Sequence, residues 1–362
     1  MFLVSNLLRC LPAGNTETAG WPWAEETDPS VYAGRSDWPQ ISIVTPSFNQ
    51  AQFLEETIRS VLLQNYPNLQ YIVIDGGSTD GSVEIIKKYQ RWIDFWVTEK
   101  DRGQSHAINK GLERCNGVWF NWINSDDLLM PNSLESLFKS LTKKSAYELT
   151  IGNVAEGPNI KNIQIRHPIC LEEAKEISMV NHKISQPGMF YKKNAISYLK
   201  ENLHLAMDYE LWVNFLIKSE MNKIIQTEKV VSFFRVHKNS KTTRREKEFL
   251  DEEKQVLATA CKQIALKKYW SLSLGGAKTN KKISKQKITL NKKLLKKEIV
   301  TKHLLGDLRK NIQTKKIKLF LPLLMCCLEA KPVLTLVMIF KETLKKMIQY
   351  ERVKSNCNRT GL

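Results

Sequence analysis

Between residues 41 and 123, short apolar runs of strand length alternate with longer segments whose apolar residues recur at helical spacing. Strands that alternate with helices in this way pair in parallel, with the helices packed on the sheet. We therefore expect an α/β fold: a Rossmann-like, mostly parallel sheet flanked by helices. The predicted elements are strands over 41–46, 69–75, 95–97 and 118–123, and helices over 53–63, 83–89 and 105–114.

Outside this region the pattern is looser. Residues 1–39 form an irregular lead-in, which we expect to pack on the domain through Trp21 and Trp23. The predicted organisation is a lead-in over 1–39, an α/β domain over 40–245 and a basic, amphipathic helical region over 246–362. After residue 141 the expected elements are strands over 149–154, 160–166, 186–191 and 230–236, and helices near 194–200 and from 206.

Composition excludes several classes of protein. With 362 residues, 42% of them hydrophobic, the chain has enough material for a real core. Its seven cysteines are scattered and form no C-x-x-C pair, which argues against a disulfide framework and a zinc site. The first eleven residues are apolar but lack a convincing cleavage site, so we do not interpret them as a signal peptide. A cytoplasmic protein is expected.

Positive charge is concentrated at one end of the chain. Residues 262–362 hold 25 Lys and Arg against 5 Asp and Glu, out of 55 and 37 in the whole sequence. Apolar residues recur between the lysines over 288–312, as in a basic amphipathic helix, and the apolar stretches 319–328 and 333–340 are each too short to span a bilayer. Peripheral attachment to an anionic membrane surface at the inner face is therefore favoured, with a helical subdomain as the alternative. Nucleic acid is disfavoured, because no recognised binding motif occurs.

Polar residues follow the strand over 118–123. The sequence there is Asn124-Ser-Asp-Asp127, at the sheet edge where open α/β folds bind ligands. Asp126 and Asp127 supply hard oxygen ligands that suit Mn²⁺ or Mg²⁺ carrying a phosphorylated substrate. The simpler alternative is that they only cap the next helix.

Two further loops carry candidate ligand-binding groups. Asp75-Gly-Gly-Ser-Thr-Asp-Gly81 combines glycines with a carboxylate at each end, which suits a nucleoside better than a phosphate; a turn residue and an N-cap are the alternatives for Asp75 and Asp80. In the loop that starts at Asp101, the cations Arg102 and Lys110 are candidates for a diphosphate, with Gly103 allowing close approach. The alternative is that both cations are simply solvated.

Four stretches in this order resemble the family 2 glycosyltransferases, which have the GT-A fold: Ile-Val-Thr-Pro-Ser-Phe-Asn49, Ile-Asp-Gly-Gly-Ser-Thr-Asp-Gly81, Asp-Arg-Gly-Gln-Ser-His-Ala-Ile-Asn-Lys-Gly111 and Asn-Ser-Asp-Asp127. The resemblance covers about 200 residues, from Ile41 to Thr242. It implies that Phe48 and Asp75 hold the base of a nucleotide sugar and that Asp126 binds the metal, although Asn124 replaces the first carboxylate of the D-x-D motif. The donor-binding set that it implies is Pro46, Phe48, Asp75, Asp80, Arg102, Gly103, Asn109, Lys110, Ser125, Asp127, Gln186 and Gly188.

The same resemblance implies the catalytic groups. Asp208 would be the general base, although Met207 replaces the acidic residue that usually precedes it, and His237 would reach the metal or the diphosphate. The implied activity is an inverting, metal-dependent transfer from a nucleotide sugar, with UDP-sugar the first choice, to a glycan or lipid-linked acceptor of cell-surface polysaccharide synthesis. A divalent ion and a cation would stabilise the leaving diphosphate, and a carboxylate would take the acceptor proton.

Two alternatives stay open at this point. One is a catalytically inactive scaffold that binds membranes or polyanions, favoured by the substitutions at Asn124 and Met207. The other is a nucleotidyltransferase. The candidate base Asp208 counts against it, because that residue is far in sequence from the nucleotide loops.

Overall fold

The computed structural model describes residues 6–14, 19–142, 145–167 and 186–260, except 239, 242–244, 246, 250, 254 and 257–258. The basic region predicted from residue 262 onward lies outside the described residues. Within the described ones, no helix is both long enough and apolar enough to cross a bilayer.

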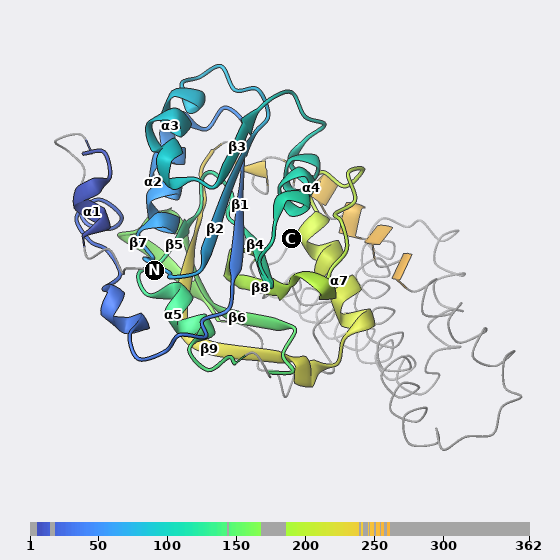
Figure 1. The fold of residues 1–362 in the computed structure, drawn as a ribbon. Helices are drawn as coiled ribbons and strands as arrows, with labels where there is room; N and C mark the ends of the chain where they lie inside the picture. Colours follow the sequence, from blue (N-terminus) through green and yellow to red (C-terminus); the bar gives the residue numbers. More distant parts are fainter. Residues whose placement is uncertain are drawn as a thin grey trace, which may run out of the picture. The chain divides into compact units, whose positions relative to one another are not determined.

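The first half of the chain builds the parallel part of one large sheet (Figure 1). Its strands lie in the order β3-β2-β1-β4, and each pairs in parallel with its neighbour. Their bounds are β1 (Ile41–Ser47), β2 (Leu69–Asp75), β3 (Phe95–Thr98) and β4 (Trp119–Trp122). All seven residues of β1 are buried, as its continuous apolar run predicts for a central strand covered on both faces.

The second half of the chain extends the sheet beyond β4. The order continues β8-β6-β9-β5, with β8 antiparallel to β4 and to β6, β9 parallel to β6, and β7 paired with β6 in a hairpin. The predicted mostly parallel α/β sheet is confirmed, with these antiparallel additions. The bounds are β5 (Leu128–Leu129), β6 (Leu149–Asn159), β7 (Asn162–Arg166), β8 (Met189–Lys192) and β9 (Ile224–Arg235).

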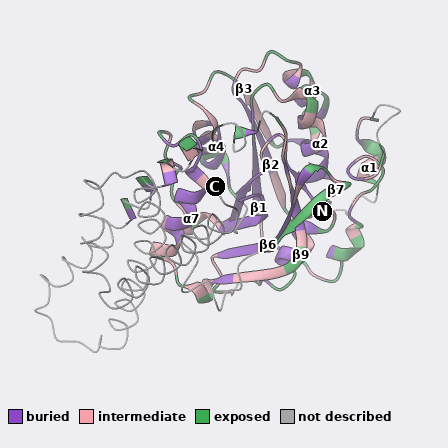
Figure 2. Ribbon diagram, turned by 180° about the vertical axis from the view of Figure 1, so that it is seen from behind, coloured by how far each residue is buried: buried purple, intermediate pink, exposed green. Residues whose placement is uncertain are grey.

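Helices lie on both sides of the sheet, with α2 and α3 on one side and α4 and α7 on the other (Figure 1). The central strands β1 and β4 are buried between these two layers, whereas β7 at the margin is exposed (Figure 2). The helices are α1 (Leu7–Cys10), α2 (Ala51–Leu62), α3 (Ser82–Tyr89), α4 (Gln104–Arg114), α5 (Ser133–Phe138) and α7 (Met207–Lys218).

The lead-in packs on the domain as predicted. Trp21 is buried in the main core and its indole N–H donates to the carbonyl of Leu129 at 2.8 Å. Trp23 stacks on the guanidinium of Arg59, 4.5 Å from the ring centre. Arg59, itself buried in α2, also donates to the carbonyls of Pro12 and Pro22, so the lead-in satisfies a buried cation of the domain.

Some elements differ from the prediction. The prediction of a helix near 194–200 is wrong, because only a 3₁₀ turn, Lys193–Ala195, forms there. The side chain of Asn109 binds both the N–H and the carbonyl of Leu199, which removes the backbone groups that a helix would use. Strand β9 begins six residues earlier than expected. The prediction missed its first half because those residues are partly exposed and several are polar, so they give no continuous apolar run. Strand β5, with two residues, is too short to give a periodic signal.

Candidate active site

A cleft of about 1030 Å³ opens at the carboxyl ends of the parallel strands. Its walls come from β1, the loops after β2, β3 and β4, the start of α7 and the end of β9, so distant parts of the sequence meet there. Seven of the residues implied by the resemblance line it: Pro46, Phe48, Gly103, Ser125, Asp126, Gln186 and Asp208. Among the described lining residues are also Gln104, Arg235 and Lys241, which sequence reasoning did not assign, and Asn124, which it named only as a replacement in the D-x-D motif.

Phe48 stands at one end of the cleft. Its side chain is 60% exposed, although the strand before it is buried, so the ring is available to a planar ligand. Gly76 lies beside it. A Cβ on Gly76 would sit 2.6 Å from Asp101 Oδ2 and 3.3 Å from Phe48 Cδ2, so only glycine lets these two side chains approach the loop.

Asp75 is fully buried beneath the same loop. Its carboxylate accepts from the backbone N–H groups of Gly77 and Ser78, at 3.1 and 2.8 Å, and from the hydroxyls of Ser78 and Thr98. These bonds fix the shape of the loop after β2. Contact between Asp75 and a base stays a prediction.

Asp80 joins the starts of two helices. It accepts from the N–H of Ala51, at the start of α2, and from the N–H and hydroxyl of Ser82, at the start of α3. Burial alone would raise the pKa of its carboxyl, but the hydrogen bonds from Ser82 and Ala51 outweigh it and hold the pKa below the ordinary value. The carboxylate therefore acts as a helix cap in this structure, the role that the sequence left as an alternative.

The acidic end of the cleft is built on the loop after β4. Asp126 Oδ2 lies 3.0 Å from Nε2 of His237, which follows β9. Arg235 donates its backbone N–H to the carboxylate of Asp127 and its Nε to the carbonyl of Asp126, each at 3.0 Å. The end of β9 thus fixes the two aspartates and brings His237 against Asp126, while metal binding by these two residues stays a prediction.

Asp127 does not line the cleft as described. Its side chain is fully buried, and it accepts from Asn124 Nδ2 at 2.9 Å besides Arg235. Burial, and then the neighbouring Asp126 carboxylate, raise the pKa of Asp127 well above its ordinary value. Its contact with a donor sugar stays a prediction, while its visible role is to anchor the loop.

A divalent ion fits the groups that face the cleft. No cluster of three or more His, Cys, Asp or Glu side chains occurs among the described residues, so a cage made by protein alone is not seen there. Mn²⁺ and Mg²⁺, however, are commonly held by one or two protein groups together with substrate phosphates and water. The carboxylate of Asp126 and the imidazole of His237 supply such a pair.

Asp208 approaches the cleft from the first turn of α7. Its Oδ1 accepts from the N–H of Tyr209 at 2.8 Å, and the helix N-terminus favours its ionised form. The backbone before it is held by Glu252, whose Oε2 accepts from the N–H groups of His204, Leu205 and Ala206. Glu252 lies beyond residue 245, where we expected the domain to end, and it still orders this wall.

The floor of the cleft contains buried polar groups. Gln186 donates to Asn121 Oδ1 and to the carbonyl of Trp122, at 2.8 and 2.7 Å. Gln186 Oε1, Ser47 Oγ and Trp122 Nε1 are buried and have no hydrogen-bond partner. Gly188 is a packing position, because a Cβ there would lie 2.7 Å from Val154 Cγ2.

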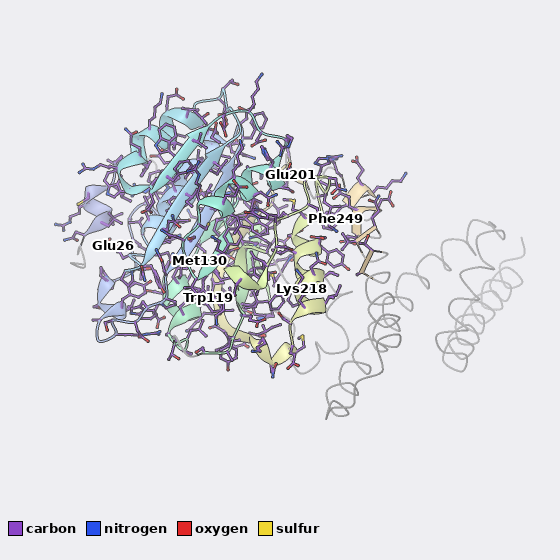
Figure 3. All side chains as sticks on the ribbon, turned by 45° about the vertical axis from the view of Figure 1, so that its right-hand side comes forward. Glu26, Trp119, Met130, Glu201, Lys218 and Phe249 are labelled. Atoms are coloured by element: carbon purple, nitrogen blue, oxygen red, sulfur yellow. The ribbon has the colours of Figure 1, made fainter. Side chains whose placement is uncertain are left out.

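The two cations predicted to face a diphosphate are engaged elsewhere. Arg102 pairs with Glu201 at 2.7 Å and Lys110 with Glu99 at 2.8 Å, and neither lines the cleft as described. Figure 3 labels Glu201, on the side of the molecule that also carries Phe249. Asn109 is buried and binds the backbone of Leu199.

Comparison with known proteins supports a common family. Residues 42–201 match the description "Glycosyl transferase family 2". An uncharacterised glycosyltransferase of Rickettsia typhi is 30% identical over 194 residues, which cover 49% of this chain and 59% of that protein. TuaG of Bacillus subtilis, whose name assigns it to teichuronic acid biosynthesis, is 33% identical over 114 residues, covering 30% and 45%. The chain thus spans about half the length of these relatives.

Solved structures agree on the fold. TarS residues 1–349 of S. aureus, in complex with UDP-GlcNAc, superpose with a TM-score of 0.53 at 16% identity, covering 72% of this chain and 71% of that one. The sheet order, the cleft at the strand ends and the family match lead to the same conclusion. Over residues 42–201 the chain matches the family 2 glycosyltransferases, and its fold is the GT-A fold.

Proposed function

We propose that this protein is an inverting glycosyltransferase that moves a sugar from a nucleotide sugar to a glycan or lipid-linked acceptor during cell-surface polysaccharide synthesis. A UDP-sugar is the first donor to test, because TarS, which shares the fold, has been solved with UDP-GlcNAc. The name of TuaG supports a cell-surface polysaccharide as the product. A cytoplasmic enzyme held at the inner membrane face by its basic C-terminal region fits this role.

One observation carries the proposal: a stacking ring, a carboxylate–imidazole pair and a second carboxylate meet around one cleft. Phe48, Asp126 and Asp208 all line it, although they are up to 160 positions apart in sequence. At about 1030 Å³ the cleft is large enough for a nucleotide sugar and part of an acceptor.

The residues suggest a single displacement. Asp208 accepts the proton of the acceptor hydroxyl, whose oxygen forms a bond to the anomeric carbon. The bond from that carbon to the diphosphate oxygen breaks, and its electron pair stays on the diphosphate. Attack opposite the leaving group inverts the anomeric configuration. Asp126 and His237 would hold Mn²⁺ or Mg²⁺, which when bound supplies positive charge to the diphosphate.

Release of nucleoside diphosphate tests the proposal. Purified protein is incubated with UDP-, GDP- and dTDP-sugars, with Mn²⁺ or Mg²⁺ and separately with a chelator, and Asp126→Ala is measured beside wild type. We expect wild type to release nucleoside diphosphate from one of these donors when the metal is present. Asp126→Ala should lose this activity. If no donor reacts and calorimetry detects no donor binding, the active-enzyme proposal is wrong and the scaffold alternative takes its place.

A further inference from the structure

The chain turns tightly after β9, and this turn brings two basic side chains to the acidic end of the cleft. Within the turn, the N–H of Ser240 donates to the carbonyl of His237, and the N–H of His237 donates to Ser240 Oγ, both at 2.9 Å. His237 reaches Asp126, while Lys241, at the end of the turn, lines the cleft itself. The loop is therefore built to present both groups together.

A chain of hydrogen bonds positions Lys241. Its Nζ donates to Gln104 Oε1 at 2.8 Å, Gln104 Nε2 donates to Asn124 Oδ1 at 2.6 Å, and Asn124 Nδ2 donates to Asp127 Oδ2 at 2.9 Å. An ammonium can only donate, so Lys241 fixes the orientation of the Gln104 amide, whose NH₂ then donates to Asn124. The Asn124 oxygen is thereby taken up as an acceptor, which leaves its NH₂ to donate to Asp127.

This chain gives a physical reason for the amide at position 124. The side chain there must accept from Gln104 and donate to Asp127. Asparagine does both, whereas an ionised aspartate could only accept and would place a third carboxylate beside Asp126 and Asp127. The hydrogen-bonding pattern of Asn124 is therefore the one that Lys241 requires, with Gln104 linking the two side chains.

Other cations of the cleft are less suited to a diphosphate at Asp126. Arg166 pairs with Glu156 and Arg235 with Glu56. Lys100 lies beside Gly77, at the end of the cleft where Phe48 stands. Desolvation lowers the pKa of Lys241, and the nearby carboxylates of Asp126 and Asp101 act against that shift, so they favour its ammonium form.

We propose that Lys241 binds the diphosphate of the donor, with Gln104 and Asn124 holding its ammonium ready beside Asp126. This inference rests on the proposed function and adds a donor-binding residue to it. The ammonium can exchange the Gln104 carbonyl for a phosphate oxygen, because its hydrogen bond to an anionic oxygen is stronger than its bond to a neutral amide oxygen. The same contact would neutralise charge on the diphosphate as it leaves.

Calorimetry of Lys241→Met separates this role from a structural one. Wild type and variant are titrated in chelator with UDP, GDP and dTDP, and with the matching nucleosides. For the diphosphate that wild type binds best, we expect the variant to lose about tenfold to a hundredfold in affinity, as for a lost charge-assisted hydrogen bond. Affinity for the nucleoside should be unchanged, and Lys241→Arg should retain most of the diphosphate affinity.

Lys238→Met is the matched control, since Lys238 is an exposed lysine of the same turn that does not line the cleft as described. It should bind like wild type, and thermal melting should show that all variants are folded. Equal diphosphate affinity in Lys241→Met and wild type would overturn the role of Lys241 while leaving the glycosyltransferase proposal intact. Wild type that binds none of the diphosphates, with or without Mn²⁺, would overturn both.

Discussion

At the scale of single residues, Phe48 gives the most direct test of how the cleft holds a base. An apolar ring that is 60% exposed contributes little to folding, so its removal should affect binding rather than stability. We expect Phe48→Ala to weaken binding of the preferred nucleoside diphosphate by about tenfold to a hundredfold, the usual effect of losing a stacked base. Calorimetry measures this change.

Tyr198 supplies the control for that experiment. It is also an exposed aromatic residue, at 56%, but it does not line the cleft as described. Tyr198→Ala should leave affinity unchanged, and Phe48→Tyr should restore most of what Phe48→Ala loses. Unchanged affinity in Phe48→Ala would show that the base binds elsewhere.

Asp208 is the second test at this scale. The amide in Asp208→Asn can still accept from the N–H of Tyr209, so the local backbone should be preserved. It cannot take the acceptor proton, and we expect kcat to fall by about a hundredfold to ten-thousandfold. Donor affinity, measured by calorimetry, should stay within about twofold of wild type. A variant that loses donor binding instead would show that Asp208 contacts the donor.

At the scale of elements, Glu252 connects the segment after residue 245 to the start of α7. Burial alone would raise the pKa of its carboxyl, but the N–H groups of Ala206, Leu205 and His204 lower it below the ordinary 4.5. A folded-state pKa below the unfolded value means that this group stabilises the fold above the ordinary pKa. The contribution is lost as pH falls through the folded-state value.

Glu252→Gln should therefore cost stability only at the higher pH. Because the carboxylate is partly solvated, we expect the free energy of unfolding to fall by no more than about 1 kcal/mol near pH 7. The difference between wild type and variant should shrink steadily as urea denaturation is repeated at successively lower pH below 4.5. A difference that persists unchanged at acid pH would mean that shape, rather than charge, sets the role of Glu252.

Elements and pairings were not equally predictable from the sequence. Strand β2 was predicted with its observed bounds, and β1 and β4 within a few residues, because a continuous buried run has a strong local signal. The partners of the site have no such signal. Arg235 and Asp127 are 108 positions apart, and Lys241 and Gln104 are 137 apart, so only the folded sheet brings them together. Polar loop residues could be named from the sequence, but not the atoms that they bind.

At the scale of the whole molecule, charge divides the chain into two parts. Residues 1–261 hold 30 Lys and Arg and 32 Asp and Glu, whereas residues 262–362 hold 25 and 5. The near-neutral residues 1–261 carry no excess of cations to attract anionic lipid, whereas a basic segment with apolar residues between its lysines is attracted to it. An enzyme with a lipid-linked acceptor would gain from this attachment, because it keeps the cleft near its substrate.

Vesicle flotation tests that arrangement. We expect the full chain to float with vesicles of phosphatidylcholine and phosphatidylglycerol and to stay behind with phosphatidylcholine alone. Raising the salt concentration should release it, since each basic residue near the surface contributes about 1 kcal/mol of electrostatic binding free energy at moderate ionic strength. A chain that ends at residue 261 should not float, provided that its melting transition shows it to be folded. Flotation of that shortened chain would place the membrane contact on residues 1–261. Failure of the full chain to float would favour a helical subdomain as the role of the basic region.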